Sequence, residues 1–172
     1  MEHMQAAVNE ACAGVQAGDG GPFGAVVVQQ GKIVATGHNM VLVTKDPTMH
    51  AEVTAIRNAC KALNTFNLSG CVLYTSCYPC PMCLGACLWA RFDSIYYAAT
   101  AEQAAEVGFD DKVFHDFLKN PRSDQNRLRA ISFENIELCN SKCFSRKLEH
   151  LPVPDSSRPF EMWAKKKDKL PY

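Results

Sequence analysis

The sequence lacks a surplus of charge of either sign, a long apolar run and any repeat at a fixed period. Its 172 residues include 18 basic and 18 acidic side chains, so the formal net charge is zero. A protein that binds a polyanion such as tRNA usually carries a surplus of Lys and Arg, so this balance favours a small substrate over nucleic acid. No apolar stretch approaches the roughly 18 residues that a membrane-spanning helix needs, and we expect no membrane partner.

The N-terminal residues do not resemble a secretory signal. Met1–Gln5 contain an acid and lead into an amphipathic pattern, whereas a signal peptide has basic residues followed by an apolar run. The nine cysteines are odd in number and scattered through apolar segments, which suits reduced thiols. Together these observations predict a cytoplasmic protein.

Several cysteines and histidines stand outside any motif. The cysteines interpreted as small buried hydrophobic residues are Cys12, Cys60, Cys71 and Cys87. Cys139 and Cys143 could form a metal or redox pair, although we favour the interpretation that they are an exposed pair without a role. The histidines expected on the surface or as satisfied core residues are His3, His38, His115 and His150.

Periodicity and turn residues indicate alternating helices and strands. The expected helices span residues 4–15, 47–63, 79–90, a short stretch after Thr100, 110–118 and 160–169. The expected strands span residues 23–29, 32–37, 71–76, 94–99 and 132–138. Asp46 and Pro47 are interpreted as the N-cap and first residue of the 47–63 helix.

This order of elements predicts one α/β domain over residues 1–172. The sheet should be mixed, antiparallel at the first hairpin and parallel where helices intervene. Residues 119–158 differ in character, because they are polar and resemble an insertion. Residues 159–172 then form a separate C-terminal segment.

The central motif combines His50-Ala-Glu52 at one helix start with Pro79-Cys80-Pro-Met-Cys83 at another. Zinc accepts histidine nitrogen and thiolate sulfur, and a catalytic zinc site has three protein ligands with the fourth position left for water. Cys80 and Cys83 are three residues apart and share one helix face. A helix N-terminus also favours thiolates. We therefore predict that Zn²⁺ is bound by His50, Cys80 and Cys83.

Glu52 is not needed as a fourth ligand. A carboxylate beside the metal can carry protons from water to the ring and to the leaving amine, so Glu52 is the predicted general base and acid. The spacing matches the His-x-Glu and Pro-Cys-x-x-Cys signature of zinc deaminases of nucleobases.

Other interpretations of the thiols stay open. Cys80 and Cys83 alone could be a thiol–disulfide centre. A closed structural zinc site could use Cys77, Cys80, Cys83 and Cys87. Neither gives a reason for a histidine and a glutamate at a helix start. A non-catalytic zinc-binding module is the rival from another class, and it has no need of Glu52.

The sequence resembles the bacterial-type guanine deaminases of the cytidine deaminase-like superfamily. The matching stretches are 20–26, 49–57, 79–86, 108–111, 158–163 and 171–172. The zinc motif is common to the superfamily, whereas Gly108-Phe-Asp-Asp111 and the terminal Tyr172 point to guanine. The resemblance implies a three-layer α/β/α sandwich with a mixed five-stranded sheet, and conversion of guanine to xanthine and ammonia.

The resemblance also implies residue roles. Asp111 would relay protons to the departing amine. The positions implied in binding the base are Phe23, Asn39, Ala51, Trp89 and Tyr172. The family exchanges its C-terminal segment between two subunits, so a domain-swapped homodimer is implied. From the residues alone, the two aromatic residues could be core, Asn39 a turn residue, Asp111 a helix cap and Tyr172 a frayed end.

Two features depart from the family pattern. Tyr78 stands where the family commonly has glutamate before Pro-Cys, and the stretch 119–158 is longer than usual. The first departure bears on the polarity around the zinc and hence on the substrate range. The alternative substrates are cytosine, guanosine, the triazine ammeline and adenosine in tRNA.

Overall fold

The structure is a computed structural model that describes residues 1–119 and 147–170. The helices are α1 (Glu2–Ala17), α2 (Val41–Thr44), α3 (Ala51–Leu63), α4 (Pro81–Ala90), α5 (Ala101–Glu106), α6 (Asp111–Lys119) and α7 (Arg158–Lys165). The strands are β1 (Gly24–Gln29), β2 (Lys32–His38), β3 (Cys71–Cys77), β4 (Ser94–Ala99) and β5 (Lys147–His150). Within these two ranges, no helix is long and apolar enough to cross a bilayer.

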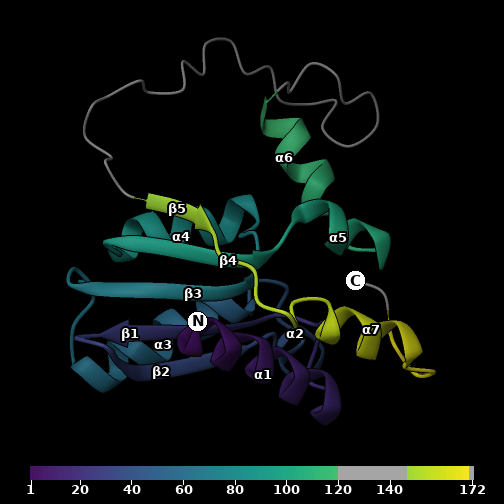
Figure 1. Cartoon of the computed structure of the whole chain (residues 1–172), viewed down its shortest axis with the longest axis horizontal. Coiled ribbons are helices and arrows are strands. Elements are labelled where there is room, and N and C mark those ends of the chain that lie inside the picture. The colour runs from purple at the N-terminus through teal and green to yellow at the C-terminus, as the bar shows by residue number, and fades with distance from the viewer. Residues whose placement is uncertain (120–146, 171–172) are drawn as a thin grey trace.

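The five strands form one mixed sheet in the order β2-β1-β3-β4-β5 (Figure 1). β1 is antiparallel to both β2 and β3, and β4 is parallel to its neighbours β3 and β5. The predicted mixed five-stranded sheet is therefore confirmed. Its fifth strand lies at Lys147–His150, within the stretch interpreted as an insertion. The strand predicted at 132–138, like Cys139 and Cys143, lies outside the described residues.

Alternating side chains of the sheet are buried under helices on both faces. Val26 and Val28 of β1 pack with Met4, Ala7 and Val8 of α1. The core on the opposite face draws on β1, β3, β4, α3 and α4, and includes Ala25, Val27, Ala51, Ala55, Leu73, Cys87 and Ile95. Successive side chains of a strand point to opposite faces of the sheet, so one strand contributes to both cores. The predicted three-layer arrangement is confirmed.

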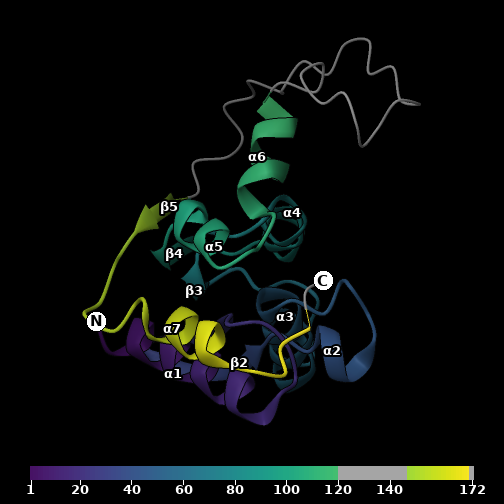
Figure 2. The same cartoon turned by 90° about the vertical axis from the view of Figure 1, so that its right-hand side faces the viewer.

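Helix α7 packs beside α1 on one side of the sheet, and α6 projects away from the sandwich (Figures 1 and 2). Phe160 and Trp163 of α7 are buried. Phe160 belongs to a small third core with Cys77, Ala99 and Ala104, near the end of β3 where the catalytic motifs lie. The contacts of α7 therefore connect the C-terminal part of the chain to that end of the sheet.

The predicted start of the 47–63 helix is wrong, since α3 begins at Ala51. The Asp46 carboxylate accepts hydrogen bonds from the Thr48 amide (2.8 Å) and the Thr48 hydroxyl (2.6 Å), so it closes a turn instead of capping a helix. A short helix, α2, precedes that turn and was not predicted. The predicted capping of α5 is confirmed: Thr100 and Gln103 form a capping box.

Candidate metal centre and active site

The candidate ligands lie at the starts of two helices. His50 is the N-cap of α3 and Cys80 the N-cap of α4, and both have extended backbone conformations. Pro81 occupies the first helical position of α4, where a missing N–H costs no hydrogen bond. Cys83 follows in the same first turn. Both helices present their positive dipole ends to the ligand site, which favours thiolates.

The ligand set fits a zinc ion. One ligand atom from each of His50, Cys80 and Cys83 lies within 4.8 Å of the others, and the Cys80 Sγ–His50 Nδ1 distance is 3.6 Å. Zinc–sulfur bonds of about 2.3 Å and zinc–nitrogen bonds of about 2.0 Å in a tetrahedron place two such atoms about 3.5 Å apart. In the described part of the chain this is the one group of at least three potential ligands, so Cys77 and Cys87 do not complete a four-cysteine site.

The two cysteines of the motif differ in acidity. A hydrogen bond from Cys83, opposed by burial and assisted by His50, lowers the pKa of Cys80 to about 4. The same contact and burial raise the pKa of the Cys83 thiol. This contact therefore favours a thiolate at the helix start, and the thiolate is the form in which cysteine binds a metal ion.

Glu52 is a buried acid in the first turn of α3, with a side chain that is 6% exposed. The Thr75 hydroxyl of β3 donates a hydrogen bond to its Oε1 at 3.0 Å. Burial, together with the charge of Cys80, raises the pKa of the Glu52 carboxyl. Because His50 occupies the N-cap and Glu52 the second helical position, the two side chains reach one site although they are two residues apart.

A small cavity lies beside the ligand set. Its lining residues are Phe23, His50, Glu52, Cys77, Tyr78, Cys80 and Asp111. Burial and the charge of Cys80 raise the pKa of Asp111 to about 6. The structure thus brings Glu52 and Asp111 to the same cavity from α3 and α6. The cavity measures about 10 Å³, room for about one water molecule, so a purine can enter only if some lining side chains move.

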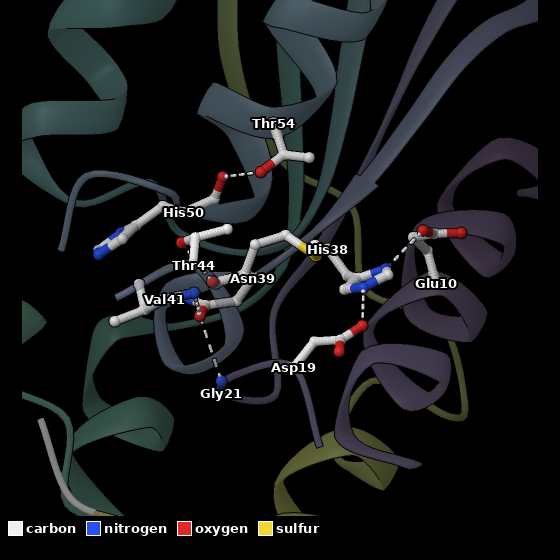
Figure 3. A network of polar contacts seen from close by, with 10 residues as sticks. Glu10, Asp19, Gly21, His38, Asn39, Val41, Thr44, His50 and Thr54 are labelled. Carbon is white, nitrogen blue, oxygen red and sulfur yellow. Dashed lines mark hydrogen bonds and ion pairs between the residues drawn. The ribbon is translucent and has the colours of Figure 1, made fainter. Parts of the chain in front are cut away.

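Asn39 is fully buried after the end of β2. Its Oδ1 accepts hydrogen bonds from the backbone N–H groups of Gly21 (3.3 Å) and Val41 (3.1 Å) (Figure 3). A Cβ on Gly20 would lie 2.1 Å from that oxygen, so this close approach requires glycine. The backbone N–H of Asn39 donates to the backbone carbonyl of Phe23 at 3.0 Å, which connects Asn39 to a residue of the cavity.

Residues 1–99 match the family described as the cytidine and deoxycytidylate deaminase zinc-binding region. The matched residues make up more than half of the chain and include His50, Cys80 and Cys83. The chain belongs to this family. Zinc is therefore the cofactor of a ligand set that the geometry already fits, and the resemblance inferred from the motifs is confirmed.

Among members of the deaminase family, guanine deaminase of Bacillus subtilis (strain 168) is 46% identical over 169 residues, which span 98% of this chain and 96% of that protein. The X-ray structure of the Bacillus subtilis guanine deaminase matches 99% of this chain and 97% of its own, with 43% identity and a TM-score of 0.68. The tRNA-specific adenosine deaminase of Aquifex aeolicus is 45% identical over 78 residues, 45% of this chain and 52% of that protein. The likeness to guanine deaminase extends over nearly the whole chain, whereas that to the tRNA-specific adenosine deaminase covers less than half of it.

The other residues that the family resemblance implies in base binding lie in different surroundings. The Phe23 ring lines the cavity and meets Phe109 edge-on, with centroids 4.8 Å apart. Ala51 is fully buried as the first residue of α3. Trp89 is 78% exposed and lies against the Arg91 guanidinium, away from the cavity. Tyr172 lies outside the described residues.

Tyr78, the departure from the family pattern, separates two cavities. It lines the small cavity at the ligand set and also a larger one of about 230 Å³ between α5 and α6. Its ring meets Tyr97 and His115 edge-on at 4.9 and 4.8 Å. The larger cavity contains none of the zinc ligands, and the chemistry of the family therefore belongs to the smaller one.

Sequence reasoning missed Thr75 near the zinc site and considered Cys77 only as a possible ligand of a closed structural zinc site. Thr75 contacts Glu52, and Cys77 lines the cavity while donating to the Thr100 carbonyl at 3.5 Å. One signal was available for Thr75: together with Ser76 it is one of two adjacent buried polar residues in the mainly apolar strand β3. The thiols interpreted as buried are confirmed at Cys12, Cys71 and Cys87, whereas Cys60 is half-buried.

Proposed function

We propose that the chain catalyses the hydrolysis of guanine to xanthine and ammonia. The observation that carries this proposal is the 46% identity to a guanine deaminase over nearly the full length of both proteins. The convergence of Glu52 and Asp111 beside the zinc ligands supports it, because the reaction needs protons to be moved at two positions on the base.

His50, Cys80 and Cys83 would hold the zinc ion. When bound, zinc supplies Lewis acidity and makes water more acidic. Glu52 takes a proton from the attacking water as it adds to C2 of the base, and gives a proton to the adjacent ring nitrogen. Its burial and raised pKa suit a carboxyl that must both accept and donate a proton near neutral pH. The Thr75 hydroxyl holds this carboxyl in place.

Asp111 serves the departing amine. As the bond from C2 to the amino group breaks, the hydroxyl added at C2 loses its proton and becomes a carbonyl of xanthine, and Glu52 and Asp111 relay one proton to the amino group, which leaves as ammonia. The raised pKa of Asp111, about 6, leaves the protonated form accessible near neutral pH. Two acids on one cavity can therefore divide the proton transfers between the ring and the leaving group.

The base would be held by Phe23, Asn39 and Ala51 of one chain. Trp89 and Tyr172 complete the proposed pocket in a homodimer that exchanges residues 159–172. The 78% exposure of Trp89 in the single chain supports a partner at that position, because a large apolar ring favours burial. We place the enzyme in the cytoplasm, where it would act in purine breakdown.

A panel of substrates tests the proposal. Ammonia release from the zinc-loaded protein is measured with guanine, guanosine, cytosine, ammeline and a tRNA substrate. We expect guanine to be the preferred substrate, and deletion of Tyr172 to reduce the rate strongly. Preference for tRNA adenosine would instead favour the activity named for the Aquifex aeolicus relative. Zinc-loaded protein that releases no ammonia from any substrate would make this chain a non-catalytic zinc-binding module.

A further inference from the structure

His38 contacts a carboxylate with each of its ring nitrogens. Its Nδ1 lies 2.8 Å from Glu10 Oε1 of α1, and its Nε2 lies 2.8 Å from Asp19 Oδ2 in the loop after α1 (Figure 3). A neutral imidazole has one donor and one acceptor nitrogen, so both contacts are favourable together only when the ring is an imidazolium. The 21% exposure of this side chain reduces competition from water.

Asp19 contacts the chain on both sides of Asn39. While its carboxylate holds His38, its backbone carbonyl accepts hydrogen bonds from Leu42 (3.0 Å) and Val43 (3.1 Å) of α2. Asp19 is therefore bonded to the residue before Asn39 and to the helix after it. The next two residues of the loop are the glycines that approach and bond the Asn39 side chain.

The segment held in this way leads directly to the zinc site. The backbone N–H of Asn39 donates to the backbone carbonyl of Phe23, a residue of the cavity beside the zinc ligands. The Met40 amide donates to the carbonyl of Met49 at 2.8 Å, next to His50. The segment that His38 begins is thus hydrogen-bonded both to a residue of the cavity and to the residue before His50.

We propose that His38 is a positioning residue for base recognition, which holds Asn39 in its binding orientation by donating to Glu10 and Asp19 at once. This inference rests on the proposed function, because the role of Asn39 in binding the base is part of it. His38 would act on affinity for the base and leave the proton transfers of Glu52 unchanged, since it reaches neither the acid nor the metal ligands.

The arrangement also makes base binding depend on pH. Glu10 and Asp19 are the charged groups that act on the ring among the described residues. The hydrogen bond to Glu10, opposed by burial and supported by that to Asp19, raises the pKa of His38 above its usual value. Deprotonation leaves one nitrogen lone pair facing a carboxylate, so one of the two contacts must break. Affinity for the base should therefore fall as pH rises through the pKa of His38.

Steady-state kinetics with guanine test the proposal. In His38→Gln we expect KM to rise roughly ten-fold with kcat within about two-fold of wild type, since contacts with charged partners are lost. Glu10→Gln and Asp19→Asn keep the side-chain shapes, and each should shift the rise in KM to lower pH. His150→Gln is the matched control, because it removes a histidine that hydrogen-bonds the Ala98 backbone carbonyl and forms no ion pair with another described residue. The proposal would be overturned if KM were unchanged in His38→Gln, or if kcat fell by as large a factor as KM rose.

A second measurement needs no turnover. Amide hydrogen exchange at Asn39, Leu42 and Val43 should accelerate in His38→Gln and in Asp19→Asn, while the amides of α3 and α4 stay protected. If wild type proves inactive on guanine, the proposed function fails, and the exchange rates still decide whether His38 holds this segment. Unaltered exchange at the three amides in both variants would contradict the positioning role itself.

Discussion

The zinc ligands and Asn39, which we assign to one proposed active site, are held by different means. Each zinc ligand is placed by the start of the helix that carries it, and those helices pack on a common core. Asn39 is instead placed largely by the loop after α1: its Oδ1 accepts from the Gly21 N–H as well as from the nearby Val41 N–H, and its backbone N–H donates to the Phe23 carbonyl. The first arrangement is local and marked by a motif, whereas the second depends on the whole fold.

This difference separates chemistry from recognition. Helix starts with neighbouring ligands can support the same zinc reaction in many family members. The surroundings of Asn39 are formed by the loop after α1 and by the residues that follow β2, none of which is a zinc ligand. Variants of the two regions should therefore differ in kind: those at the zinc ligands should abolish catalysis, and those around Asn39 should weaken binding.

The largest effect is expected from Cys83→Ala. Loss of one of three protein ligands should reduce zinc content to below about a tenth of wild type and lower stability with it, because metal binding is coupled to folding. Zinc analysis and thermal unfolding of the purified protein measure both effects. Cys60→Ala removes a half-buried thiol outside the ligand set and should keep the metal. Full zinc occupancy in Cys83→Ala would mean that other residues are the ligands.

Asp111→Asn should come next. Removing the acid that serves the leaving amine is expected to lower kcat by roughly 100-fold, within the range for general acid–base catalysis, with zinc retained. The exposed neighbour Asp110 offers the matched control Asp110→Asn, which should stay near wild-type kcat. Equal rates for the two variants would remove Asp111 from the mechanism.

A smaller loss is expected at Thr75. Thr75→Val keeps the side-chain shape but removes the hydroxyl that bonds Glu52, and kcat should fall by about ten-fold as the carboxyl loses its fixed orientation. Thr75→Ser restores a hydroxyl and should recover most of the rate. Stopped-time assays of xanthine formation compare the three proteins. A serine variant as slow as the valine variant would show that packing, not the hydrogen bond, matters at this position.

The smallest effect is expected on the free energy of unfolding of His38→Gln. The pKa of His38 is raised in the folded chain above its unfolded value of about 6.5, so its stabilisation is complete below about pH 6.5 and is lost as pH rises through the folded pKa. Relative to His38→Gln, wild type should be more stable by about 1 kcal/mol at low pH, with the difference shrinking at alkaline pH. Urea unfolding of both proteins across this range measures it, and a difference independent of pH would exclude the imidazolium.

Much of the fold could be predicted because most elements carry strong local patterns. The valine-rich β1 and the period of α1 are examples, and both cores follow from them. The start of α3 was predicted too early because an Asp-Pro pair is as typical of a turn as of the beginning of a helix, and here Asp46 and Pro47 lie in a turn. Helix α2 has four residues, too few for periodicity to show. β5 is mostly exposed and lacks alternation, so only its pairing with β4 identifies it.

The residues of the candidate site also include some that the sequence could predict and some that it could not. His50, Glu52, Cys80 and Cys83 were predicted from spacing, since both helix starts impose the geometry. The contact of Thr75 with Glu52 joins residues 23 positions apart, and that of His38 with Glu10 joins residues 28 apart. Such contacts depend on how the layers pack and leave no periodic trace in the sequence.

The central claim is that the zinc ligands and Glu52 have separate tasks, holding the metal and moving the protons. It is tested most directly by measuring zinc content and xanthine formation on the same preparations of wild type and Glu52→Gln. We predict full zinc in both proteins and a loss of turnover of at least about 1,000-fold in the variant. Xanthine formation at an undiminished rate by zinc-loaded Glu52→Gln would contradict the account.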